Sequence, residues 1–138
     1  MTMKEFDWPI RVYYDDTDAG GVVYHARYLA FYEHARTEML RQFNINQQFL
    51  LETQATAFVV KKMNIDYVYP ARLDNLLIVR SAIENVKRAS LVFKQRIIDE
   101  QGLLYSSAEV LIACVDLNKK KPCVFPELFI SEFDKWKI

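Results

Sequence analysis

One segment of the chain, from about Arg27 to Phe43, limits the possible folds more than any other. Its apolar residues recur every three or four positions, which is the period of an α-helix packed along one stripe. The stripe contains Tyr28, Tyr32, Ala35, Met39 and Phe43, and it is widened by Leu29, Phe31 and Leu40. A helix this apolar should be covered on most of its sides, so the rest of the chain has to supply a concave cover.

The remaining pattern predicts that cover as a β-sheet. Apolar residues alternate with polar ones from position 59 to 69, up to Pro70, which is typical of a half-buried strand. Further strands are predicted at 10–14, 76–86, 91–97 and 108–114, with buried faces at 91, 93, 95, 97 and at 108, 110, 112, 114. Gly102 ends a hairpin turn at 99–102, where a positive φ is needed. The connections are short, so the strands should be antiparallel.

Two shorter helices are also predicted. One runs from about 47 to 52 with Asn46 as its N-cap, and the other is a surface helix from Pro126 to Trp136. No repeat or linker interrupts the chain, so we expect a single domain over residues 1–138. The architecture is therefore predicted as α+β, a long central helix wrapped by a curved antiparallel sheet. Its long apolar edge strands would be prone to aggregation if they stayed unpaired. A homodimer in which the two sheets join edge to edge would pair them.

Composition excludes several classes of function. Eighteen basic residues balance eighteen acidic ones, so there is no electrostatic footprint for nucleic acid. No apolar run is long enough to span a membrane, and the N-terminus has no signal-peptide core, so we expect a soluble cytoplasmic protein. His25 and His34 lack zinc-type spacing, and no metal is predicted. Cys114 lies in a strand-like run and is interpreted as a buried thiol, not as a disulfide partner of Cys123.

The best functional candidate is the segment that leads into the long helix. Asp15, Asp16 and Asp18 lie within four positions, directly before Gly20 and Gly21. The first-turn N–H groups of a helix are unpaired and carry the positive end of its dipole, and glycines just before them allow close approach of a ligand. Such a backbone site can stabilise an oxyanion, and a nearby carboxylate can act as a nucleophile or as a base for water.

The same segment resembles a known family. The run RVYYDDTDAGGVVYHARYLAFYEHARTEML is similar to the signature of the hotdog-fold acyl-CoA thioesterases of the 4-hydroxybenzoyl-CoA thioesterase type, and more closely to their YbgC branch, which is associated with the Tol-Pal envelope system. The resemblance continues through AFVVKKMNIDYVYPARLD, LVFKQRI and AEVLIACVDLNKKKP. It implies a hotdog fold and hydrolysis of acyl-CoA, or of acyl groups on acyl carrier protein, without a cofactor. It also implies homotetramers built from dimers.

Carried over to this sequence, the resemblance implies that Asp18 is the catalytic carboxylate. It also places the thioester carbonyl at the N-terminus of the long helix, where the backbone N–H of His25 or of a neighbour would polarise it. Gly21, Val22 and Tyr24 would then line the substrate site. The ring of His25 can act as a base or only line the site, and both interpretations stay open.

Other roles and functions compete with these. Asp15 and Asp16 are interpreted as turn residues, and Asp18 can also form an Asx turn. Glu33 can face the same cleft, although this is the less favoured interpretation. The basic pairs and runs at 87–88 and 119–121 can bind coenzyme A phosphates but are better explained as solvated loops.

Two alternative functions remain open at this point. A hydratase or dehydratase on the same fold would use an acid and a histidine, for which Asp18 and His25 are candidates. A protein of a different class would bind or dock acyl thioesters, acyl carrier protein, phospholipid-synthesis enzymes or envelope proteins, with hydrolysis incidental. If a substitution of Asp18 abolished the effect of the protein in cells, that result would argue against a function as a binding module.

Overall fold

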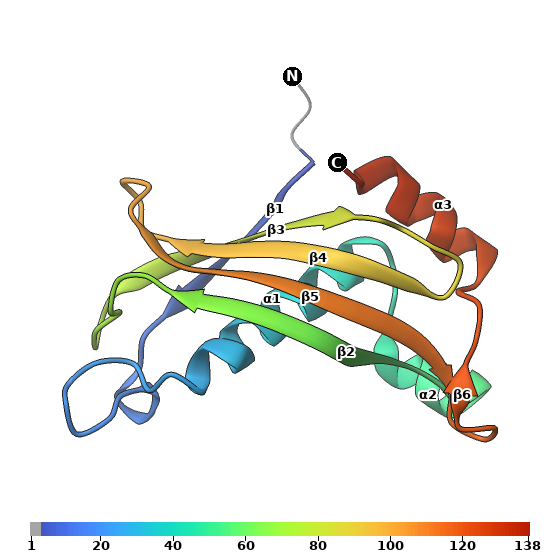
Figure 1. Ribbon diagram of the computed structural model, residues 1–138, viewed down its shortest axis with the longest axis horizontal. Helices are drawn as coiled ribbons and strands as arrows, with labels where there is room; N and C mark the ends of the chain where they lie inside the picture. The colour runs from blue at the N-terminus through green and yellow to red at the C-terminus, as the bar shows by residue number, and fades with distance from the viewer. Residues whose placement is uncertain (1–3) are drawn as a thin grey trace.

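The computed structural model describes residues 4–138, and Figure 1 shows a helix lying along one face of a curved sheet. In chain order the elements are β1 (Phe6–Arg11), the 3₁₀ turn η1 (Tyr14–Asp16), α1 (Arg27–Gln42), α2 (Gln47–Gln54), β2 (Thr56–Tyr67), β3 (Leu76–Glu84), β4 (Ser90–Ile98), β5 (Leu104–Asp116), β6 (Lys121–Pro122) and α3 (Glu127–Trp136). The predicted hotdog architecture, a central helix against a curled antiparallel sheet, is confirmed.

The main sheet has the strand order β1-β3-β4-β5-β2, and β6 pairs with β5. Every pairing is antiparallel, as predicted. The inward faces of β4 and β5 are the predicted ones, since Phe93 and Val110 lie opposite each other and are both buried. They meet the buried face of α1, which carries Tyr32 and Met39. The core is therefore the layer between α1 and the sheet.

The first strand is not where the sequence pattern placed it. The prediction of 10–14 is wrong, because β1 covers Phe6–Arg11 and pairs with β3 along its whole length. β1 is an edge strand, so Pro9 can take part in it although it has no N–H to donate. Tyr14 instead starts η1, where Thr17 N–H donates to its carbonyl oxygen at 3.2 Å.

A register shift also changes the predicted face of β2. A bulge lies between Val60 and Lys62, where two successive residues of β2 span one step of β5. As a result Val60, not Val59, shares the inner face with Met63 and Ile65, and the prediction that Val59 belongs to that face is wrong. The strand also ends at Tyr67, earlier than the predicted stop at Pro70.

The turn and cap predictions for the shorter elements are confirmed. Asn46 Oδ1 accepts a hydrogen bond from the Phe49 N–H at 3.0 Å and caps α2. Gly102 has a φ of 88° in the β4–β5 turn, a conformation that favours glycine. α3 begins directly after Pro126 and lies at the surface, with the buried ring of Phe133 packed against Phe43.

One side of α1 is less covered than predicted. The helix packs against β1 and β3, while the inner face of β2 stays partly open. Leu29 on α1 is 45% exposed, and Val60 and Tyr67 on β2 are 50% and 48% exposed. The seam between α1 and β2 is therefore an open apolar strip at the edge of the sheet. None of the helices in residues 4–138 is long and apolar enough to cross a membrane.

The packing of α1 can be tested with Met39→Ala. Met39 is fully buried, so truncation should lower the free energy of unfolding by about 2–5 kcal/mol, through lost burial and a residual cavity. Chemical denaturation followed by circular dichroism would measure the change. Gln42→Ala, at an exposed position of the same helix, should stay within about 0.5 kcal/mol of wild type. Equal effects of the two substitutions would contradict the assignment of the core.

Candidate active site

The acid and glycine segment folds into a small hairpin of its own. Thr17 and Val23 form an isolated bridge, and the N–H of Asp18 donates to the carbonyl oxygen of Val22 at 2.9 Å. Gly21 has a φ of 79°, a left-handed conformation that side chains rarely adopt, and its N–H donates to the Asp18 carbonyl oxygen at 3.0 Å. The glycine thus closes a turn that presents Asp18 at its tip.

The carboxylate of Asp18 is exposed and reaches into an open cavity. Its Oδ1 accepts a hydrogen bond from the Gly20 N–H at 2.8 Å, which is the Asx turn that sequence analysis weighed. Among residues 4–138 no hydrogen bond or ion pair is formed by Oδ2. The cavity has a volume of about 540 Å³ and is lined by Tyr14, Thr17, Asp18, Ala19, Gly21 and Leu73. Asp18 therefore keeps one oxygen free for chemistry.

The residues that follow carry unpaired backbone donors at the N-terminus of α1. The N–H of Tyr24 donates to the Asp16 carbonyl oxygen, and the N–H of Arg27 donates to the Tyr24 carbonyl oxygen, both at 2.9 Å. Within residues 4–138, the backbone N–H groups of His25 and Ala26 have no hydrogen-bond acceptor. Both lie at the positive end of the helix dipole, an arrangement suited to a developing negative charge.

His25 lines a second cavity, next to the first turn of α1. This cavity of about 240 Å³ is lined by Val23, His25, Tyr28, Tyr67, Val68, Tyr69 and Pro70. The hydroxyl of Tyr67 donates to the His25 carbonyl oxygen at 3.0 Å, and the Tyr24 ring packs on the His25 ring with centroids 4.6 Å apart. Burial raises the pKa of Tyr67, so its phenol stays protonated at neutral pH and can keep donating.

Tyr67 is a site residue that sequence analysis missed. It comes from β2, far along the chain, and fixes the backbone at the start of α1. Only its place at the end of an alternating strand could have suggested this role. The hydroxyl of Tyr28 similarly accepts the N–H of Ala71 at 3.2 Å and ties the β2–β3 loop to the helix.

The predicted site residues are therefore neighbours, but they do not form one cluster. Asp18 and Gly21 line one cavity, while His25 lines another, and no hydrogen bond joins Asp18 to His25. Val22 is partly buried and forms a bridge with Arg72 of the β2–β3 loop, and Tyr24 is half-exposed beside His25. A paired acid and histidine, which a hydratase would need, is not present in this arrangement.

Asp16 holds the segment in place. It is buried, and its Oδ2 accepts the Tyr13 N–H at 2.8 Å. Its Oδ1 accepts a hydrogen bond from Arg27 Nε at 2.9 Å and lies 2.8 Å from Arg27 Nη2 in an ion pair, which ties the turn to the first residue of α1. Asp15 is exposed. The interpretation of Asp16 as a residue that serves the fold is confirmed.

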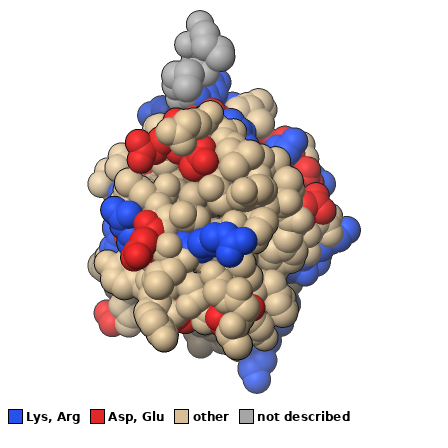
Figure 2. Space-filling model, turned by 90° about the vertical axis from the view of Figure 1, so that its left-hand side faces the viewer, with Lys and Arg blue, Asp and Glu red and all other residues tan. Residues whose placement is uncertain are grey.

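The basic loops considered for phosphate binding lie elsewhere. Residues 87–88 are in the β3–β4 loop and residues 119–121 lead into β6, both at the end of the sheet opposite the Asp18 turn (Figure 1). Figure 2 shows the end that carries the turn, where charged side chains of both signs are scattered among uncharged ones. Glu33 lines neither the Asp18 cavity nor the His25 cavity. It lines a separate cavity farther along α1, so the less favoured interpretation that Glu33 faces the same cleft is not supported.

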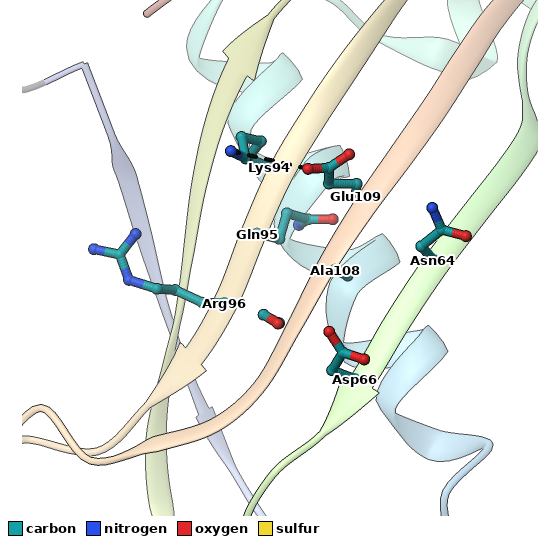
Figure 3. Close-up of a pocket in the computed structure, with 8 residues that line it drawn as sticks. Asn64, Asp66, Lys94, Gln95, Arg96, Ala108 and Glu109 are labelled. Carbon is teal, nitrogen blue, oxygen red and sulfur yellow. Dashed lines mark ion pairs between the residues drawn. The ribbon is translucent and has the colours of Figure 1, made fainter.

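A further depression lies on the outer face of the sheet, away from α1. It has a volume of about 400 Å³, and Figure 3 shows it crossed by side chains of β2, β4 and β5. Both of its basic side chains already have partners, since Lys94 faces Glu109 at 3.9 Å and Arg96 binds Glu5 at 3.2 Å. It also lacks the helix N-terminal amides, so the α1 end is the better candidate site.

Comparison with known proteins identifies the class. Residues 20–106 match the Thioesterase superfamily. A protein described as "Acyl-CoA thioesterase YbgC" from Haemophilus influenzae is 57% identical over 137 residues, covering 99% of this chain and all of the relative. "Acyl-CoA thioester hydrolase YbgC" from Escherichia coli O157:H7 is 53% identical over 96% of this chain and 98% of its own length.

A solved structure agrees with these relatives. A probable thioesterase from Bartonella henselae superimposes with a TM-score of 0.83 at 38% identity, covering 88% of this chain and 99% of its own. The chain therefore belongs to the thioesterase superfamily. Within it, the chain is a member of the YbgC group of acyl-CoA thioesterases, as its sequence resemblance implied.

The role of Asp16 in the fold can be tested by comparing a substitution of Asp16 with one of the neighbouring Asp15. Asp16→Ala leaves Arg27 and the Tyr13 N–H without their partner, so it should destabilise the protein by about 1–3 kcal/mol. Hydrogen exchange should also become faster across residues 12–26, and a thermal melt with exchange mass spectrometry would measure both effects. Asp15→Ala, at an exposed position, is the matched control and should change neither. Unchanged hydrogen exchange in Asp16→Ala would contradict the inference that Asp16 links the turn to α1.

Proposed function

We propose that residues 1–138 form one hotdog domain that hydrolyses acyl-CoA thioesters to a free acid and coenzyme A. Asp18 supplies the carboxylate, and the backbone N–H groups of His25 and Ala26 bind the oxygen of the thioester carbonyl. The observation that carries this proposal is the pair of unpaired amides at the N-terminus of α1, beside a turn that presents a carboxylate. The names of the relatives support the thioester substrate.

The chemistry needs little more than these groups. Charge builds up on the carbonyl oxygen as the tetrahedral intermediate forms, and two fixed amides at a helix N-terminus stabilise it there. The free Oδ2 of Asp18 either attacks the carbonyl carbon to form an anhydride or takes a proton from an attacking water. A thiolate leaves readily, so no separate acid is required. Gly21, Val22 and Tyr24 form the wall along which the substrate lies.

The proposal can be tested with Asp18→Asn, which keeps the size of the side chain and removes its charge. Thiol release from a panel of short, long and aromatic acyl-CoAs should fall by roughly a hundredfold or more in kcat, the size expected for a lost base or nucleophile. Asp15→Asn is the control and should keep wild-type activity, since Asp15 is exposed and lines no described cavity. Equal activity of wild type and Asp18→Asn would remove Asp18 from the mechanism.

The working form is proposed to be a homodimer joined along β2. This edge strand is 12 residues long, and Val59 and Val60 on it are exposed. An unpaired apolar edge is a template for a second strand, so pairing β2 with its symmetry mate would remove the hazard and enclose the seam beside α1 between the two copies. Residues of both copies would then line each site, and two such dimers would form a tetramer.

Oligomeric state tests this arrangement directly. Sedimentation of wild type should give a mass of two or four times 16.3 kDa. Val59→Lys places a charge on the edge strand and should shift the protein toward monomer. Leu128→Lys changes a side chain that is already 82% exposed on α3 and should leave the mass unchanged. A wild-type monomer would contradict edge pairing.

The cellular setting is proposed from the resemblance alone. The enzyme would act in the cytoplasm, with acyl carrier protein as a second carrier of its substrates and with a functional link to the Tol-Pal envelope system. The relatives carry hydrolase names, which favours hydrolysis over the binding-module alternative. Copurification partners that persist in Asp18→Asn would reveal any docking role separate from hydrolysis.

A further inference from the structure

A third cavity lies at the far end of the seam between α1 and β2. It has a volume of about 90 Å³, and its apolar wall is made by Leu40, Phe58, Val60, Phe93 and Ile112. Its polar side is made by Glu33, Arg36, Thr37 and Gln47. The cavity is large enough to hold a small polar group, and none of the roles assigned above uses it.

Arg36 is the unusual member of this cavity. The residue is only 7% exposed, and its guanidinium has five N–H donors. The structure of residues 4–138 shows one hydrogen bond from it, Nη1 to Gln95 Oε1 at 3.0 Å, and no carboxylate within ion-pair distance. Burial lowers the pKa of Arg36 to about 10, so the group is still charged at neutral pH. A buried charge without a counterion is costly unless a ligand supplies one.

The nearest acidic side chain forms no ion pair with Arg36 in residues 4–138, although its charge acts to raise the Arg36 pKa against the effect of burial. Glu33 lies one turn earlier on α1, and its side chain is 55% exposed at the rim of the cavity. Its Oε2 accepts the hydroxyl of Thr37, and Gln47 Nε2 donates to the same hydroxyl at 3.2 Å. These contacts hold Glu33 beside Arg36 but outside ion-pair distance, so the hydrogen bond to Gln95 is the one that the guanidinium makes within residues 4–138.

The cavity lies in line with the proposed thioester position. The His25 cavity and the Arg36 cavity both have one wall on α1 and one on β2, at opposite ends of the two elements. Arg36 is nine residues beyond Arg27, so about 13 Å of helix axis separates them, the reach of an extended chain of roughly ten carbons. The seam between them is apolar, with Leu29 on α1 and Met63 and Ile65 on β2.

We propose that Arg36 binds a carboxylate at the far end of the acyl chain, so that ω-carboxyacyl thioesters of medium length are substrates of this enzyme. The inference rests on the proposed function, since it places the thioester at the start of α1. The seam takes the methylenes, and the guanidinium receives the terminal carboxylate through charge-assisted hydrogen bonds. Arg36 is then a specificity-determining residue and takes no part in the hydrolytic step.

The kinetic test compares two acyl-CoAs of equal length, decanoyl-CoA and its ω-carboxy counterpart. Wild type should hydrolyse the ω-carboxy substrate with a kcat/KM roughly tenfold higher or more, as expected for a buried charge-assisted contact. Arg36→Met should lose this preference, and Arg36→Lys should keep part of it. Arg41→Met removes an exposed positive charge from the same helix and should leave the preference unchanged.

Glu33→Gln gives a second readout that leaves the Arg36 side chain in the protein. It removes a like charge beside the bound carboxylate, so the preference for the ω-carboxy substrate should rise several-fold. A merely structural Arg36 would give no such rise. Because Glu33 is at the surface, this variant is expected to fold and keeps the proposal testable if Arg36→Met does not fold.

Direct binding separates this inference from the hydrolytic mechanism. Calorimetry with free decanedioate and decanoate on wild type and on Asp18→Asn should show tighter binding of the dicarboxylate to both proteins, and loss of that difference in Arg36→Met. If the dicarboxylate binds more tightly and Asp18→Asn keeps full hydrolytic activity, the proposed mechanism is overturned while the Arg36 site is still supported. The Arg36 site would be overturned if wild type bound decanedioate and decanoate equally well and hydrolysed the two acyl-CoAs with equal kcat/KM.

Discussion

The packing of α1 against the concave face of the sheet is the interaction on which the rest of the structure depends. Tyr32, Ala35 and Met39 on the helix are fully buried, and they meet sheet residues such as Val79 and Phe93. Each large apolar side chain buried in this way contributes about 1.5–3 kcal/mol. The contact also fixes where α1 begins, and its first unpaired amides are the donors around which the candidate site is built.

The same packing leaves one side of the helix open. α1 lies nearer β1 and β3, so the inner face of β2 is only partly covered and a seam runs along the edge of the sheet. Cavities lie at both ends of this seam, one beside His25 and one beside Arg36. An apolar seam with polar groups at its two ends suits an elongated amphipathic ligand, which would connect the proposed thioester site at the start of α1 to the buried charge farther along it.

Three neighbouring aspartates show how strongly position decides role. Asp16 is buried and binds Arg27, so it belongs to the scaffold. Asp15 is exposed, and Asp18 lies at the tip of a glycine turn with one oxygen unpaired in the described structure. A carboxylate that already satisfies backbone and guanidinium donors is held rigidly, whereas one at an open cavity is available for reaction. The buried Asp16 therefore helps to position the turn that carries Asp18.

The sequence by itself determined the elements whose patterns are local. The helical period of 27–43, the alternation of 91–97 and 108–114, the cap at Asn46 and the turn at Gly102 all depend on residues close in the chain, and each is confirmed. The resemblance of the segment around Asp18 indicated the class of enzyme. Tertiary structure alone decided the bulge in β2, which changes the face of Val59. It also decided the separate cavities of Asp18 and His25 and the burial of Arg36, which has no ion-pair partner among residues 4–138. These features are set by which distant strands pair and how far α1 reaches across them, and no local period encodes those choices.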